Sequence, residues 1–118
     1  NVRRVGEVAA LLADTGVVAI VPIISPFQQG RNAARSVHER AGLKFIEVHM
    51  ATPLEECAAR DPKGLYRKVR EGQMTGLSGV EALYEPPSSP DIVLGARGES
   101  IEQSVAALIV AVRQAATS

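Results

Sequence analysis

The chain has 118 residues, which is enough for one domain with a single modest core. Hydrophobic residues make up 46% of it, which argues against intrinsic disorder, and its 13 Lys and Arg balance its 13 Asp and Glu. No global charge therefore recruits nucleic acid or a membrane surface, and no apolar run approaches the roughly 18–20 residues of a membrane span. The single cysteine, Cys57, excludes an internal disulfide framework and fits a reducing compartment such as the cytoplasm.

The first half of the chain alternates helical and strand patterns. Residues 2–14 carry apolar side chains at helical spacing and end before Gly16, which favours a helix C-cap there; the apolar positions are Val5, Val8, Ala9 and Leu12. The aliphatic run Val17–Ile24 is typical of a strand buried on both faces of a parallel sheet. After a polar loop, residues 32–40 are predicted to form a helix and residues 45–50 a second strand.

The second half continues the alternation. Thr52-Pro53-Leu54-Glu55 combines a Thr N-cap, a Pro at the first helical position and a Glu three residues after the cap, and so predicts a helix running to about residue 60. A short basic helix is expected over 64–71, an irregular loop over 72–90 and a third strand over 91–94. Ser100 is expected to cap a last helix. Strands that alternate with helices predict an α/β fold with a parallel sheet flanked by helices.

The segment from residue 60 to residue 70 has the most unusual charge. It places five cations in eleven residues beside one acid, Asp61; the cations are Arg60, Lys63, Arg67, Lys68 and Arg70. A glycine-punctuated loop follows. Cations on a short helix beside a mobile loop suit a protein that closes over a polyphosphate or a sulfate ester, because they neutralise charge that moves during group transfer.

Two further positions on the first half of the chain are candidates for ligand binding. Ser25 follows the predicted strand Val17–Ile24, at the carboxyl end where α/β proteins place ligands. Arg31 and Arg35 lie four residues apart on one predicted helical face, so they either point at the same anion or are solvated surface side chains.

Several short motifs together resemble the adenylyl-sulfate (APS) kinase family. They are Ile24-Ser25-Pro26-Phe27, Ala59–Tyr66, Gly76-Leu77-Ser78-Gly79-Val80 and Tyr84-Glu85-Pro86-Pro87, and the resemblance covers nearly all of the chain. Enzymes of this family phosphorylate the 3′-hydroxyl of adenylyl sulfate with ATP and make PAPS in sulfate assimilation. The resemblance implies a P-loop nucleotide kinase-like fold, ATP with Mg as the cofactor, adenylyl sulfate as the substrate and a cytoplasmic location.

The resemblance also implies roles for individual residues. Adenylyl sulfate is expected to contact Asn1, Ile24, Ser25, Phe27, Lys63, Gly76 and Leu77, and the ATP adenine or phosphates are expected to contact Arg60. Ser25 is the candidate catalytic residue, and we favour contact with the substrate over a covalent role because no base is evident beside it. Residues 60–90 are expected to form a lid. The chain departs from the family at Leu77, where the family has Phe, and at Gly30 and Asn32, which replace two acids.

Two elements of the family chemistry are missing from these residues. No Gly-x-x-x-x-Gly-Lys-Ser/Thr phosphate loop occurs in the chain, and neither does the Asp-Gly-Asp-Asn-Val-Arg segment that the family uses for magnesium and substrate. The resemblance therefore implies that the chain corresponds to the C-terminal two-thirds of such a kinase, and we expect it to be truncated at the N-terminus. His38 and His49 have no partner at metal-ligand spacing, so we expect no metal site within the chain.

Three functions remain open from the sequence. The first is an adenylyl-sulfate kinase present as a fragment, acting on a small molecule as a homodimer or fused to an ATP sulfurylase domain, with no nucleic-acid or membrane partner. The alternative is a non-catalytic APS kinase-like domain that binds PAPS or a partner for regulation. A generic nucleotide kinase fragment for another acceptor explains the fold but not the Ile-Ser-Pro and Tyr-Glu-Pro-Pro motifs. A phosphate loop upstream of Asn1 would distinguish an enzyme from a regulator.

Overall fold

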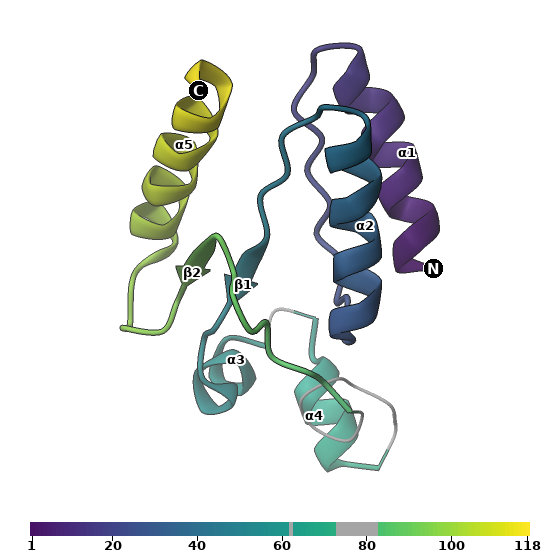
Figure 1. Ribbon diagram of the computed structural model, residues 1–118. Helices are drawn as coiled ribbons and strands as arrows, with labels where there is room; N and C mark the ends of the chain where they lie inside the picture. The colour runs from purple at the N-terminus through teal and green to yellow at the C-terminus, as the bar shows by residue number, and fades with distance from the viewer. Residues whose placement is uncertain (62, 73–82) are drawn as a thin grey trace.

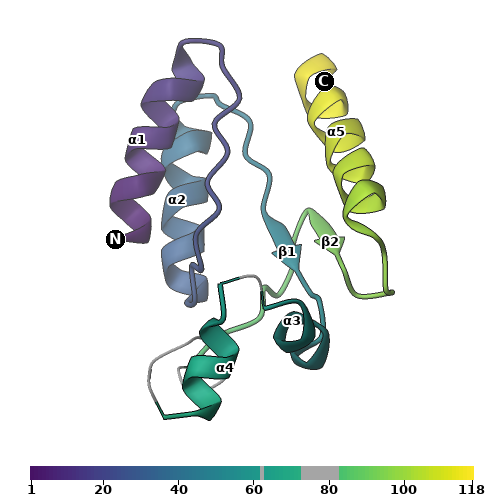
Figure 2. The same ribbon diagram turned by 180° about the vertical axis from the view of Figure 1, so that it is seen from behind.

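A computed structural model describes residues 1–61, 63–72 and 83–118 of the chain. Its elements in chain order are α1 (Val2–Asp14), α2 (Gln28–Arg40), β1 (Val48–Met50), α3 (Leu54–Arg60), α4 (Leu65–Arg70), β2 (Ile92–Leu94) and α5 (Ile101–Thr117). The α1–α2 pair lies on one side of the two strands and α5 on the other, with α3 and α4 beyond one end of the strands (Figure 1). The reverse view shows the same arrangement (Figure 2).

Helices α1 and α2 pack closely because small residues form their contact. Gly6, Ala9 and Ala10 of α1 and Ala34 of α2 are buried. A Cβ atom added to Gly6 would lie 2.9 Å from the Cβ of Ala34, a separation that real Cβ atoms do not adopt. The predicted helix over 2–14 is confirmed, but of its expected apolar stripe only Ala9 is buried.

The sheet is parallel, as predicted, and the described residues contain two of its strands. Val48 pairs with Ile92 and Met50 with Leu94. The ladder continues past β1, since the Ala51 amide donates to the Leu94 carbonyl at 2.7 Å. Both strands are shorter than predicted, and α2 begins four residues before the predicted Asn32.

The prediction of a buried strand over Val17–Ile24 is wrong. Residues 17–27 contain no strand and run beside the α1–α2 pair, and the Ile20 side chain is 77% exposed. Pro22 interrupts the run and has no N–H to donate to a ladder, which disfavours a central strand. An aliphatic pattern reports a need for burial, but a strand also needs a neighbour, and no strand among the described residues pairs with this segment.

The predicted helix starts are partly confirmed. Ser100 and Gln103 form a capping box at the start of α5, as expected from Ser100 as the cap. Helix α3 instead has Pro53 at its N-cap, without a side-chain cap bond, so the predicted Thr cap is wrong. The reason is that the Thr52 hydroxyl is packed against Gly95, where an added Cβ would lie 2.2 Å from Oγ1.

Large apolar side chains remain on the surface of α5 and β2. Val93 and four residues of α5 are 45% or more exposed, the four being Ile101, Val105, Ile109 and Val110. No helix in the described parts of the chain has the length and apolar character that crossing a membrane requires.

Paired glycine substitutions test the close approach of α1 and α2. Gly6→Ala is expected to lower the free energy of unfolding by about 1–2 kcal/mol, because the new methyl group overlaps Ala34 and forces the helices apart. Gly30→Ala is the matched control in α2, since its methyl group would sit at an ordinary 3.5 Å from the Val2 Cβ. That substitution is expected to stabilise the protein by up to about 1 kcal/mol through helix propensity. Chemical denaturation measures both, and equal effects would contradict the packing described.

Candidate active site

Four segments gather around the carboxyl ends of the two parallel strands. Helix α3 follows β1 at this end, and the loop before α5 follows β2. The segment that contains Ser25 reaches the same end of the molecule before α2 begins, and α4 lies beyond it (Figures 1 and 2). Ligands of open parallel sheets bind outside the carboxyl ends of the strands, so this end is the candidate site.

Ser25 has an unusual backbone. Its φ of 46° lies in the left-handed region, which is uncommon for a residue other than glycine, and Pro26 follows it. Ser25 is half-buried, whereas its neighbours Ile24 and Phe27 are 59% and 49% exposed. Strained backbone of this kind is retained where surrounding contacts hold it in place, and it concentrates at functional sites.

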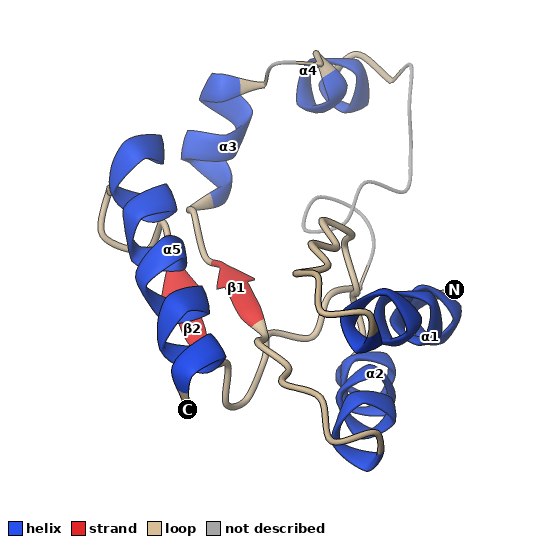
Figure 3. Ribbon diagram, turned by 90° about the horizontal axis from the view of Figure 1, so that it is seen from above, coloured by secondary structure: helices blue, strands red, loops and turns tan. Residues whose placement is uncertain are grey.

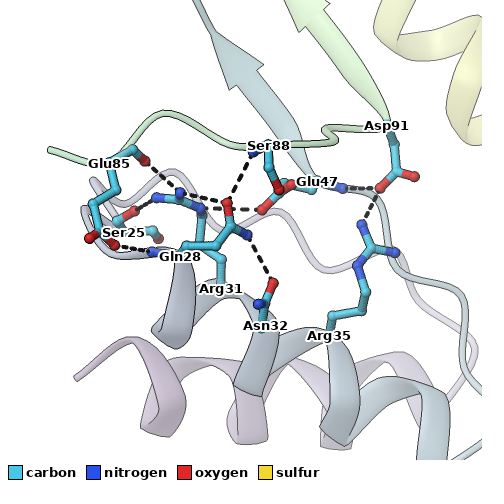
Figure 4. A network of polar contacts seen from close by, with 9 residues as sticks. All are labelled: Ser25, Gln28, Arg31, Asn32, Arg35, Glu47, Glu85, Ser88 and Asp91. Atoms are coloured by element: carbon cyan, nitrogen blue, oxygen red, sulfur yellow. Dashed lines mark hydrogen bonds and ion pairs between the residues drawn. The ribbon is translucent and has the colours of Figure 1, made fainter.

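The contact that holds Ser25 comes from Arg31. The buried Arg31 guanidinium donates through Nη1 to the Ser25 carbonyl and through Nη2 to the Glu85 carbonyl (Figure 4). Its Nη2 also lies 3.3 Å from Gln28 Oε1, and its Nε lies 3.3 Å from Glu47 Oε2. The Nε–carboxylate contact is an ion pair without an aligned hydrogen bond, since Nε has no hydrogen-bond partner among the described residues.

Further hydrogen bonds join residues 25–28 directly to residues 84–88, the two segments that Arg31 contacts. The Glu85 amide donates to the Pro26 carbonyl at 2.7 Å, and the Gln28 amide donates to Glu85 Oε1 at 2.9 Å. The Ser88 amide donates to Gln28 Oε1 at 3.1 Å. Residues 25–28 and 84–88 therefore form one structural unit, although more than fifty residues separate them in the sequence.

Arg35 has a different task from Arg31. Its Nη2 lies 2.6 Å from Asp91 Oδ2, and the same carboxylate oxygen accepts from the Glu47 amide at 2.7 Å. Burial raises the pKa of Asp91, but these donors outweigh it and hold the pKa below its usual value. Arg35 thus fixes the start of the sheet. The sequence left two alternatives for Arg31 and Arg35: that they bind one anion together, or that they are solvated surface side chains. The structure fits neither alternative.

The turn before α4 presents Lys63 to solvent. Asp61 has a φ of 24°, and its carboxylate accepts from the Tyr66 and Arg67 amides at 3.1 Å each. Burial acts to raise the pKa of Asp61, but these amides and the positive charge of Arg70 lower it below its usual 3.8. The Asp61 carboxylate therefore fixes the turn, and Lys63 is exposed beside it.

Arg60 lies at a hollow between α3, the end of β2 and α5. The hollow has a volume of about 190 Å³, and its lining includes Thr52, Arg60, Gly95, Glu99, Ile101 and Val105. The Glu99 carboxylate accepts from the Gly95 amide at 2.7 Å and from the Arg97 amide at 2.6 Å, which lowers its pKa. The Glu99 carboxylate thereby fixes the conformation of the loop after β2. Arg60 Nη2 also pairs with Glu56.

The sequence profile of the adenylylsulphate kinase family matches residues 1–95. The chain belongs to the adenylylsulphate kinase family. It is 44% identical over 109 residues to the adenylyl-sulfate kinase of Geotalea uraniireducens, covering 92% of this chain and 51% of that protein. It is also 44% identical over 103 residues to the adenylyl-sulfate kinase of Saccharomyces cerevisiae, covering 87% of this chain and 51% of that protein.

A solved structure of the family matches the fold. The structure of the Mycobacterium tuberculosis APS kinase in complex with AMPPNP and APS aligns with a TM-score of 0.86 at 43% identity, covering 95% of this chain and 64% of that one. The prediction of a P-loop kinase-like α/β fold is confirmed by this likeness. The chain spans about half the length of the curated relatives that it matches.

The structure brings some predicted site residues together and leaves others apart. Arg60 and Lys63 flank the turn between α3 and α4, while residues 24–27 come from the other side, next to α1 and α2 (Figure 3). No hydrogen bond or ion pair within the described ranges joins Ser25 to Arg60 or Lys63. Asn1 is exposed before α1, and Gly76 and Leu77 lie outside the described residues. The described ranges also contain no cluster of His, Cys, Asp and Glu that could hold a metal ion.

Three acids that no sequence pattern singles out organise the candidate site: Glu47, Glu85 and Glu99. A signal exists for Glu47, which is a lone acid inside an apolar strand pattern, because buried acids need a partner. Glu85 belongs to the Tyr-Glu-Pro-Pro motif, but its partners are more than fifty residues away and local patterns cannot identify them.

Substitution of Asp61 tests the turn that presents Lys63. Asp61→Asn leaves one carbonyl oxygen for two amides, so amide exchange at Tyr66 and Arg67 is expected to rise several-fold. Asp14→Asn, on the exposed end of α1, is the control. Because the folded pKa is lowered, the stabilisation is complete above pH 3.8 and is lost as the pH falls through the folded value. A carboxyl titration midpoint at or above 3.8 would contradict these contacts.

Proposed function

We propose that the protein to which this chain contributes is an adenylyl-sulfate kinase, which transfers the γ-phosphoryl group of ATP to adenylyl sulfate. The observation that carries the proposal is the likeness, at a TM-score of 0.86 and 43% identity, to an APS kinase in complex with AMPPNP and APS. Cytoplasmic sulfate assimilation is the corresponding setting, in line with the single cysteine.

The substrate side of the proposed site lies around Ser25. The backbone of Ser25 is held in a fixed conformation. Ile24 and Phe27 beside it are exposed and leave apolar surface free for the adenine ring. Lys63 supplies a positive charge from the opposite side, on a turn fixed by Asp61. Asn1, Gly76 and Leu77 complete the set by resemblance to the family.

The ATP side of the proposed site lies at the hollow beside α3 and α5. Arg60 and the Gly95–Glu99 loop form part of its lining, and a guanidinium can pack on an adenine or pair with phosphate. The described residues contain no cluster that could hold a metal ion, so we assign the Mg ligands to residues outside the described ranges, and the phosphate loop to residues outside this chain.

A regulatory function is the second candidate. Gly30 and Asn32 replace two acids of the family pattern, and Asn32 accepts a hydrogen bond from the Gln28 side chain at 2.8 Å instead of forming an ion pair. Such departures favour a non-catalytic domain that binds PAPS or a partner. A lid formed by residues 60–90, a homodimer and a fusion with an ATP sulfurylase domain remain proposals under either function.

Turnover by the full-length protein decides between the two functions. When the protein is incubated with adenylyl sulfate, ATP and Mg, we expect ADP and PAPS to form in equal amounts. Chromatography measures both products. Binding of PAPS with no ADP formed would favour the regulator, and absence of both binding and turnover would contradict the kinase and a regulator that binds PAPS.

Substitution of Lys63 tests the substrate side of the site. Lys63→Ala in the full-length protein is expected to weaken adenylyl sulfate binding by at least about tenfold, because a charge-assisted contact to an anion is lost. Fold stability is expected to change little, since Lys63 is exposed. Arg40→Ala, at the exposed end of α2, controls for the general loss of positive charge. Equal losses in the two variants, measured by calorimetric titration, would refute the role of Lys63.

A further inference from the structure

We infer that Arg31 is a positioning residue for the adenylyl sulfate site: it holds Ser25 in its left-handed conformation and joins it to Tyr84 and Glu85. The inference rests on the proposed function and adds a residue that does not itself face the ligand. In this structure the proposed substrate side is formed from two distant segments, and the Arg31 side chain donates to a carbonyl of each.

The fork of the guanidinium suits this role. One amino group donates to the Ser25 carbonyl and the other to the Glu85 carbonyl, so a single planar group sets the separation of the two chains (Figure 4). A lysine carries the same charge but offers one nitrogen, which cannot reproduce two donors in a fixed geometry. The conservative change therefore separates geometry from charge.

Glu47 makes the burial of this cation tolerable. The Arg31 and Glu47 side chains are 7% and 10% exposed, and each would leave an uncompensated buried charge if the other were removed. Tyr84 covers the guanidinium with its ring, whose centroid lies 5.7 Å from Cζ, and the same ring stacks on His49 of β1. Arg31 is thus enclosed by groups from three separate segments, which fixes its position.

The strained backbone of Ser25 explains why loss of the Arg31 contact would affect the site. A φ of 46° is costly for a serine, and a residue before proline is normally extended. Loss of the donor to its carbonyl would let Ser25 relax and would redirect its hydroxyl. A displacement of about 1 Å at a reacting or binding group can cost up to about a hundredfold in rate.

The proposed ATP side is separate from this network in the parts of the chain that the structure describes. There, none of the contacts of Arg31 involves Arg60, Gly95 or Glu99, which line the hollow beside α5. A positioning role therefore predicts a selective effect on adenylyl sulfate, whereas a general folding role predicts an effect on both substrates.

The experiment compares Arg31→Lys with Arg40→Lys in the full-length protein. Arg31→Lys is expected to raise the KM for adenylyl sulfate about tenfold while the KM for ATP stays within about twofold. Hydrogen exchange is expected to rise together in peptides covering residues 24–30 and 83–89. Arg40→Lys is expected to change neither. An unchanged KM for adenylyl sulfate, or an equal rise for both substrates, would overturn the positioning role.

The outcomes also separate this inference from the proposed function. If the wild-type protein turns over adenylyl sulfate and Arg31→Lys behaves like it, the inference fails and the function stands. If the wild type neither binds nor phosphorylates adenylyl sulfate, the function fails and with it the substrate role of Arg31. Should Arg31→Lys not fold, Arg31→Gln combined with Glu47→Gln removes both charges together and must show the same selective KM change.

Discussion

The buried guanidinium of Arg31 is the constraint on which the proposed substrate side of this structure depends. Burying a cation costs free energy unless its charge is compensated and it is hydrogen-bonded. Here the hydrogen-bond acceptors are residues 25–28 and Glu85, and Glu47 supplies the compensating charge. Those segments cannot shift independently without leaving a buried charge unsatisfied. The helix pair, the first strand and the segment that leads to the second strand are linked through this one side chain.

Two residues in the described ranges have strained backbone, and both are held by polar contacts. Ser25 and Asp61 are the non-glycine residues with positive φ among the described ranges, and each is fixed by polar contacts: Ser25 through its carbonyl and Asp61 through its carboxylate. Each lies within two residues of a position that the family resemblance assigns to adenylyl sulfate. Local rules of backbone preference tend to be broken at functional sites, where the surrounding structure compensates.

Sequence patterns predicted what depends on local physics. Helix α1, the N-cap at Ser100 and the parallel sheet follow from periodicity, capping chemistry and alternation of elements, and the structure confirms them. The prediction of a strand over Val17–Ile24 is wrong because hydrophobic content does not reveal whether a partner strand is present, and because Pro22 interrupts the run. Arg31 was assigned to an anion or to solvent, since its partners at Glu47 and Glu85 are distant in sequence.

A crystal structure of the full-length protein with adenylyl sulfate is the most direct test of the site described here. We expect the ligand at the carboxyl ends of the strands, in contact with Ser25 and Lys63, with the Arg31 bonds to the Ser25 and Glu85 carbonyls intact. Adenylyl sulfate bound elsewhere, or a Ser25 released from Arg31 in the complex, would contradict the assignment of this end of the sheet as the substrate site.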